Sequence, residues 1–130
     1  MRKIFVNLPV KDLKAAMGFF SELGFTYHPD YTGDDGACMI VDENIFVMLV
    51  TEPRFKDFIN NDISDATRAT EVLTCLSAES REEVDDLVAK ALAAGGTAWK
   101  PKMDYGTMYG GSFQDLDGHV WELMFMEPAS

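Results

Sequence analysis

Hydrophobic and polar residues alternate along residues 3–8, which is the two-residue period of a half-buried strand. Pro9 then favours the edge of a sheet, because proline has no backbone N–H to donate. From Leu13 onward the apolar residues recur at helical spacing, with Asp12 placed as the N-cap and Gly24 placed to end the helix. The pattern therefore predicts a strand followed by a helix.

Three further apolar segments follow this helix, and turn-forming residues separate them. These segments predict strands at residues 25–31, 37–41 and 45–51. Pro53 then opens a short amphipathic helix, and the polar residues 60–69 form the predicted connection to the rest of the chain. The first half of the chain is thus predicted as strand, helix and three strands.

The second half repeats this order. Ser80 and Glu83 form a capping box at the start of a helix that Gly95 is placed to end. The other segments predict strands at residues 70–77 and 97–103, a flexible loop at 104–111 and a hairpin at 112–128. Asp117-Gly118 is the predicted turn of this hairpin, because glycine tolerates the positive φ that such turns demand.

The two halves also share a sequence motif. Residues 42–53 align with residues 117–128 without a gap, and an aspartate, an aromatic residue and a Glu-Pro pair fall in register. In this alignment Glu122 corresponds to Val47, and the chain reads as two copies of one unit. Neither half buries enough apolar surface alone, so we expect one domain over residues 1–130. Its predicted parts are unit one at about 1–52, a connection at about 53–69 and unit two at about 70–127.

Composition and charge narrow the class of protein. The 130 residues carry a net charge of −11, which argues against nucleic acid and anionic membranes as partners, since both are bound by basic patches. No apolar run is long enough to span a membrane, and residues 1–3 lead directly into a strand, so we expect a cytoplasmic protein. The cysteines, Cys38 and Cys75, are too few for a disulfide framework and are predicted to be buried, inert thiols.

Two motifs carry a resemblance to a known family. The chain opens with FVNLPVKD at residues 5–12, continued by Phe-Phe at 19–20 and Leu-Gly-Phe at 23–25, and it closes with DLDGHVWE at 115–122. Together with the two units, these motifs resemble the vicinal oxygen chelate superfamily, which includes glyoxalase I, bleomycin-resistance proteins and extradiol dioxygenases. The resemblance covers essentially the whole chain. It implies an α+β fold of two βαβββ units whose curled mixed sheets form a cup, and a homodimer in which the partner completes each cup.

The resemblance also implies positions for a metal site. In metal-using relatives the ligands come from the first and last strand of each unit. Carried over, these positions fall on Phe5, Val47, Leu73 and Glu122. Only Glu122 can bind a metal, and such sites need about three or more protein donors. A shift by two residues offers Asn7 and Cys75 instead, a poor mixed site without histidine. We therefore expect no metal cofactor, with one divalent ion as the alternative.

Several side chains are candidates for contact with a ligand in the cup. Glu122 has two equally weighted interpretations, a cup-facing base or ligand hook and a relic of the family motif held by a hydroxyl or a lysine. Asn7 could bind a ligand or a neighbouring strand. An aromatic and thioether group around a glycine-rich loop could stack on a planar ligand or simply pack in the core or a dimer interface. The candidate ligand contacts are Phe5, Asn7, Leu73, Cys75, Trp99, Tyr105, Met108, Tyr109 and Met124.

Three functions remain open from the sequence. The leading hypothesis is metal-independent binding of a small, largely apolar organic molecule, in the manner of a bleomycin-resistance protein. The alternative is a glyoxalase-type lyase or isomerase in which Glu122 serves as base or metal ligand, so the sequence does not decide whether the protein is an enzyme. The third is a structural or partner-binding role with an empty cup. The missing first-strand ligands favour the first hypothesis over the second.

Overall fold

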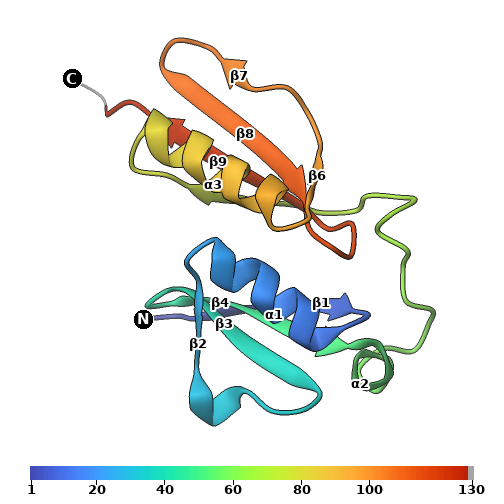
Figure 1. The fold of residues 1–130 in the computed structure, drawn as a ribbon. Coiled ribbons are helices and arrows are strands. Elements are labelled where there is room, and N and C mark those ends of the chain that lie inside the picture. The colour runs from blue at the N-terminus through green and yellow to red at the C-terminus, as the bar shows by residue number, and fades with distance from the viewer. Residues whose placement is uncertain (129–130) are drawn as a thin grey trace. The chain divides into compact units, whose positions relative to one another are not determined.

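A computed structural model describes residues 1–128 of the chain (Figure 1). The chain divides into two compact units, Met1–Ser64 and Asp65–Ser130. Each unit holds one curled mixed sheet with a helix on one face, and each begins with a strand, a helix and further strands. This is the predicted α+β fold of two βαβββ units.

Unit 1 contains a four-stranded sheet in the order β1-β4-β3-β2, in which β1 runs parallel to β4 and the other pairs are antiparallel. Its elements are β1 (Ile4–Val10), α1 (Leu13–Glu22), β2 (Thr26–Tyr27), the 3₁₀ turn η1 (Pro29–Tyr31), β3 (Gly36–Asp42), β4 (Ile45–Thr51) and α2 (Glu52–Lys56). Pro9 lies inside β1, which is an edge strand with β4 as its only neighbour. No strand pairs with the outer edge of β1, so a residue without an N–H is tolerated there.

Both ends of α1 form as the sequence predicts. The Asp12 side chain accepts a hydrogen bond from the backbone N–H of Ala15 at 3.1 Å, which satisfies a donor of the first turn. Gly24 follows the helix with a φ of +100°, a conformation that glycine adopts without the steric cost of a Cβ atom. The helix buries Phe19 and Phe20 against the sheet.

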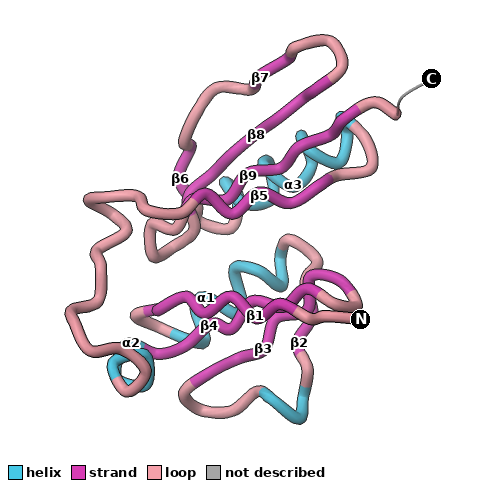
Figure 2. The backbone as a smooth tube through the Cα atoms, turned by 180° about the vertical axis from the view of Figure 1, so that it is seen from behind, coloured by secondary structure: helices cyan, strands magenta, loops and turns pink. Residues whose placement is uncertain are grey.

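Unit 2 contains a sheet in the order β5-β9-β8-β6, with β7 also pairing with β8. Its elements are β5 (Leu73–Ser77), α3 (Arg81–Ala93), β6 (Thr97–Ala98), β7 (Met103–Asp104), β8 (Met108–Gln114) and β9 (Val120–Met126). The Ser80 hydroxyl accepts from the backbone N–H of Glu83 at 3.1 Å, and Gly95 ends the helix at a φ of +108°. α3 lies across one face of this sheet (Figure 2).

Some strands are shorter than predicted. Residues 25–31 form a strand only at β2, because the His28 ring accepts a hydrogen bond from the Asp30 N–H at 3.3 Å and Pro29 starts a 3₁₀ turn. Residues 97–103 are split into β6 and β7 by a segment that contains Pro101, which has no N–H to donate to β8. The first strand of unit 2 begins at Leu73 and not at residue 70.

One predicted loop is largely a strand. Residues 104–111 were expected to be flexible, but β8 starts at Met108 and pairs with β9 along its whole length. Gly111 is buried in this strand, where an added Cβ would stand 2.9 Å from the Val88 side chain of α3. The glycine therefore lets the helix approach the sheet closely. The prediction of a flexible loop here was wrong, because it took the glycines as a sign of flexibility.

The terminal hairpin is organised by Asp115. Its Oδ1 accepts the backbone N–H groups of Asp117 at 2.9 Å and His119 at 3.0 Å, and its Oδ2 accepts the indole N–H of Trp121 at 3.0 Å. Burial raises the pKa of the Asp115 carboxyl. Gly118 takes a φ of +89°, as predicted for the turn. The loop between β8 and β9 is thus fixed by side-chain bonds and not by a two-residue turn.

Candidate functional site

The sheet of unit 2 has two distinct faces. Tyr109 points to the α3 face, since its hydroxyl donates to Asp85 of α3 at 2.6 Å. Residues alternate along a strand, so Gly110 and Ser112 point to the opposite face. We call this opposite face of unit 2 the distal face. It is formed by Leu73, Cys75, Ser77, Thr97, Met103, Met108, Gly110, Ser112, Gln114, Val120, Glu122, Met124 and Met126.

Glu122 lies in a polar row across the distal face. The ladder pairs it with Cys75 on β5 and with Ser112 on β8. Ser112 is buried, and its hydroxyl accepts the backbone N–H of Lys100 at 3.1 Å. Glu122 is half-buried, with the apolar Val120 and Met124 as its neighbours on the same face of β9. A thiol, a carboxylate and a hydroxyl therefore stand side by side on three adjacent strands.

Cys75 is exposed on β5, which corrects the prediction of a buried thiol. β5 is an edge strand, so Cys75 has a neighbouring strand on one side only. Partial burial and the negative charge of Glu122 raise the pKa of this thiol, because both disfavour the thiolate. Cys38 is fully buried, as predicted.

The equivalent face of unit 1 is identified in the same way. The Tyr27 hydroxyl donates to the Met17 carbonyl of α1 at 2.9 Å, so Tyr27 points to α1. Tyr27 is paired with Met39 on β3, and Met39 is paired with Val47 on β4, so the three side chains lie on the same face. Val47 therefore points to α1, and it is buried there. The face away from α1 carries Phe5 and Asn7, the two sequence candidates of this unit.

Unit 1 has no carboxylate at the position that matches Glu122. Asn7 pairs with Met48 in a parallel ladder, just as Cys75 pairs with Glu122, so Met48 and not Val47 is the structural counterpart of Glu122. The ungapped alignment is displaced by one residue. The cause is the unequal loops, since two residues separate Asp42 from Ile45 whereas five separate β8 from β9, and β3 has a bulge before Asp42.

The remaining candidates of unit 1 form an aromatic surface. Phe5 stacks on Phe46 with ring centroids 4.9 Å apart and an interplanar angle of 11°. Phe5 is about half exposed (48 %), so one side of its ring is free of Phe46. The Asn7 amide donates to the Phe5 carbonyl at 3.3 Å.

The structure brings most candidates of unit 2 together on the distal face. Leu73, Met108 and Met124 point there with Glu122, and the Tyr105 hydroxyl reaches the sulfur of Met103 at 3.6 Å. Tyr109 is not among them, because it lies on the α3 face. Trp99 is exposed in the segment between β6 and β7.

Sequence reasoning did not select Ser112 or Met103. The five-residue loop between β8 and β9 places Ser112 opposite Glu122. The three-residue connection between β7 and β8 places Met103 opposite Gly110.

Glu122 is the one family metal donor that the described parts of these faces retain. The ladder positions hold Asn7 and Met48 in unit 1, and Cys75 and Glu122 in unit 2. Among residues 1–128, no three His, Cys, Asp or Glu side chains gather at ligand distance. A divalent ion needs about three or more protein donors, so the donors of each unit, taken separately, do not fit a resident ion.

Comparisons with known proteins agree with this geometry. The sequence profile of the Glyoxalase/Bleomycin resistance protein/Dioxygenase superfamily matches residues 4–123. The chain therefore belongs to this superfamily, as the two motifs predicted. No curated protein matches the chain. No helix among residues 1–128 is both long and apolar enough to cross a membrane.

Several solved structures share the fold. A hypothetical protein, SA1046, from S. aureus is 28 % identical with a TM-score of 0.81, over 96 % of this chain and 94 % of that chain. A glyoxalase/bleomycin resistance protein/dioxygenase family enzyme from Burkholderia phytofirmans is 18 % identical with a TM-score of 0.77, over 94 % and 96 %. The fosfomycin resistance protein FosX from Listeria monocytogenes is 19 % identical with a TM-score of 0.69, over 96 % and 93 %. The last two show likeness of fold alone.

Proposed function

We propose that this chain binds a small, largely apolar organic molecule without a metal ion, using the distal face of unit 2. The observation that carries the proposal is the position of Glu122. It is a single half-buried carboxylate on a face whose other side chains are methionines, aliphatic groups and uncharged polar groups. Such a surface suits a ligand with a large apolar part and one hydrogen-bond donor.

Each part of this face has a role in the proposal. The methionine side chains are flexible and polarisable, so they adapt to an apolar or aromatic ligand. Glu122 accepts a hydrogen bond that fixes the ligand's orientation. Unit 1 has a separate candidate surface of its own, on its face away from α1, where the exposed side of Phe5 offers a flat ring and Asn7 offers an amide.

The family supports the same proposal, since its named members include resistance proteins that act on small molecules. We propose that the protein acts as a homodimer that sequesters its ligand in the cytoplasm.

The alternative is a lyase or isomerase of the glyoxalase type, and the polar row favours it. Glu122 would serve as a base or metal ligand, next to a thiol and a hydroxyl that could exchange protons with a substrate. The donor set disfavours the metal-dependent form of this alternative, because only Glu122 and Cys75 stand together in unit 2.

Native mass spectrometry of protein purified without chelator is the first test. It reports the oligomer, any metal and any retained ligand together. We expect a dimer without metal, with or without an organic adduct. One stoichiometric divalent ion per chain would overturn the metal-independent proposal and call for lyase and isomerase assays.

Substitution of Glu122 separates the two functions. Glu122→Gln keeps the size of the side chain and one acceptor oxygen, so binding should be spared or weakened by less than about tenfold. In the enzyme alternative the same change should lower turnover by about a hundredfold or more. Glu22→Gln, at the exposed end of α1, is the matched control and should change neither. Full activity of Glu122→Gln in any assay that detects turnover would exclude Glu122 as the base.

A further inference from the structure

The hairpin formed by β7 and β8 carries different chemistry on its two sides. Met103 pairs with Gly110, so both point to the distal face, whereas Asp104 pairs with Tyr109, and both point to α3. Gly110 leaves room for Met124, whose methyl group would be 3.1 Å from an added Cβ. The distal side of the hairpin is thus apolar, and the α3 side is polar.

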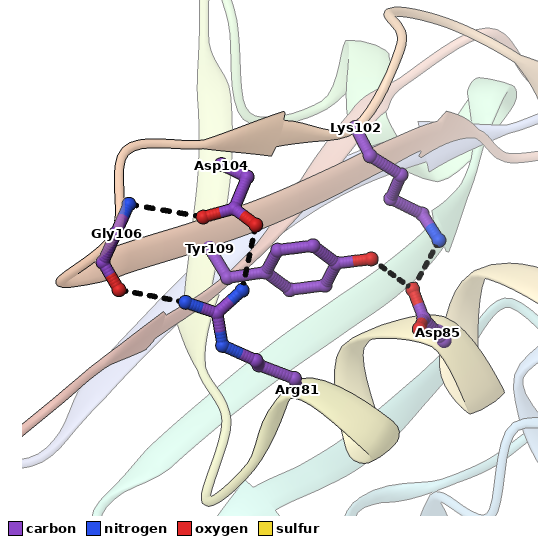
Figure 3. A network of polar contacts seen from close by, with 6 residues as sticks. All are labelled: Arg81, Asp85, Lys102, Asp104, Gly106 and Tyr109. Carbon is purple, nitrogen blue, oxygen red and sulfur yellow. Dashed lines mark hydrogen bonds and ion pairs between the residues drawn. The ribbon is translucent and has the colours of Figure 1, made fainter.

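Arg81, the first residue of α3, binds the tip of this hairpin at two points (Figure 3). Its Nη1 donates to Asp104 Oδ2 at 2.9 Å, and its Nη2 donates to the Gly106 carbonyl at 2.6 Å. The other carboxylate oxygen of Asp104 accepts the Gly106 N–H at 2.9 Å. One guanidinium therefore fixes both a strand residue and the turn that follows it, which a lysine could not do with the same geometry.

A second set of contacts fixes the base of the hairpin. Asp85, one turn further along α3, accepts hydrogen bonds from the Tyr109 hydroxyl and from the Lys102 ammonium group (Figure 3). The Tyr109 ring lies 5.0 Å from the Arg81 guanidinium carbon and 5.9 Å from Lys102 Nζ. We call these five residues, Arg81, Asp85, Lys102, Asp104 and Tyr109, the α3 clamp.

The clamp is charged around neutral pH. The hydrogen bond from Arg81 lowers the pKa of Asp104, and the hydrogen bond from Lys102 lowers the pKa of Asp85. Its side chains are largely accessible to water, and such ion pairs contribute little to global stability. The tip of the hairpin is also exposed, with Tyr105 at 70 %, so little apolar burial fixes it. The clamp therefore holds a segment that packing leaves free to move.

We propose that Arg81 is a positioning residue that sets the shape of the ligand-binding face from the opposite side of the sheet. By holding Asp104 and Gly106 it fixes Met103, Tyr105 and Met108 over the distal face. A fixed hairpin binds more tightly, because the ligand does not have to order it. This inference rests on the proposed function for its ligand, while its structural half can be measured on the free protein.

The test uses Arg81→Met and Asp104→Asn, with Arg54→Met as the matched control. Arg54 also pairs with an aspartate, Asp57, at 3.1 Å and lies 4.6 Å from an aromatic ring, but it belongs to α2 of unit 1. Each protein is labelled at its methionine methyl groups and studied by NMR. There are eight such groups in the natural chain and in Asp104→Asn, and nine in each arginine variant, where the new signal is set aside. Amide hydrogen exchange and titration with Nile red, an uncharged planar dye, complete the set.

We expect both unit 2 variants to shift or broaden the methyl signals of Met103 and Met108 and to speed exchange of the Tyr105 and Gly106 amides by about tenfold or more. Affinity for Nile red should fall by about threefold to tenfold, since the ligand must then order the hairpin. The effect of the double variant should be smaller than the sum of the two single effects, because both substitutions remove the contact between Arg81 and Asp104. Arg54→Met should behave as the natural chain does.

Each contrary result has its own meaning. Unchanged exchange and methyl signals in Arg81→Met would show that the clamp does not fix the hairpin, which overturns the inference whatever the dye does. Faster exchange with unchanged dye affinity would make Arg81 structural only, and would also overturn it. The natural chain could also bind no Nile red, or bind it without moving the methyl signals of Met103, Met108, Met124 and Met126. Either result would show that the proposed ligand face is wrong. Amide hydrogen exchange would still decide whether Arg81 fixes the hairpin.

Discussion

Replacing Asp115 by asparagine tests how the terminal hairpin holds Glu122 in place. Asp115 is 5 % exposed and accepts three hydrogen bonds, from two backbone N–H groups and from the indole of Trp121. Asparagine has nearly the same shape but only one acceptor oxygen. It can keep the two backbone bonds or the indole bond, and it places an NH₂ group against the other donors.

The magnitude follows from the donors that remain unpaired. Trp121 is 2 % exposed, so its indole N–H has no access to water when asparagine faces it. An unsatisfied buried donor costs about 1–3 kcal/mol. Burial of the Asp115 carboxylate is unfavourable, as its raised pKa shows. Asparagine carries no charge and avoids this cost, which offsets part of the loss. We therefore expect Asp115→Asn to lower the free energy of unfolding by about 1–2 kcal/mol at neutral pH.

Urea unfolding followed by far-UV circular dichroism measures this change, because its signal does not depend on Trp121, the buried one of the two tryptophans. The matched experiment repeats Asp115→Asn in a Trp121→Phe background, where no indole donor is left. There the cost of Asp115→Asn should shrink by about 1 kcal/mol. Equal costs in the two backgrounds, or an Asp115→Asn variant as stable as the natural chain, would refute the role given to this hydrogen bond.

The other predictions concern backbone conformation and pH. Gly118→Ala should destabilise the protein by more than about 2 kcal/mol in the same urea assay, because φ is +89° and the new Cβ would stand 2.8 Å from the backbone nitrogen of Thr67. Gly24→Ala, at φ +100° with nothing within 4 Å of the new Cβ, should cost only about 1 kcal/mol. Burial raises the pKa of Tyr27 to about 12, so the stability that the neutral phenol contributes is complete below its ordinary pKa and is lost as the pH rises through 12. Between pH 9 and 11 the free energy of unfolding should fall by about 1.4 kcal/mol more in the natural chain than in Tyr27→Phe, and parallel pH profiles would contradict this.

The fold could be predicted because its signals are local. The N-caps at Asp12 and Ser80 and the positive φ of Gly118 each depend on a few neighbouring residues, and each forms as expected. The errors arose where a long-range contact decides the outcome. Gly111 looks like a loop residue in the sequence, but the approach of α3 to β8 is what requires a glycine there.

The candidate site was harder to predict from the sequence than the fold, because it depends on the register between strands that are distant in the sequence. A shift of one residue moves a side chain to the other face of a sheet. For this reason Val47 was wrongly matched with Glu122, although the alternation along β1 was read correctly. The partnership of Cys75, Glu122 and Ser112 needed both the parallel and the antiparallel ladder, and neither can be read from the order of residues along the chain.

The two units differ at the strand positions where the family resemblance places metal ligands. In unit 1 the strand pair β1–β4 presents Phe5 stacked on Phe46, and Asn7 paired with Met48. In unit 2 the corresponding pair β5–β9 keeps a carboxylate, Glu122. Taken separately, unit 1 therefore offers an aromatic ring and a neutral amide on this face, and unit 2 offers one carboxylate next to a thiol and a hydroxyl. Because a divalent ion needs about three or more protein donors, the substitutions in unit 1 and the single carboxylate of unit 2 disfavour a resident ion within either unit.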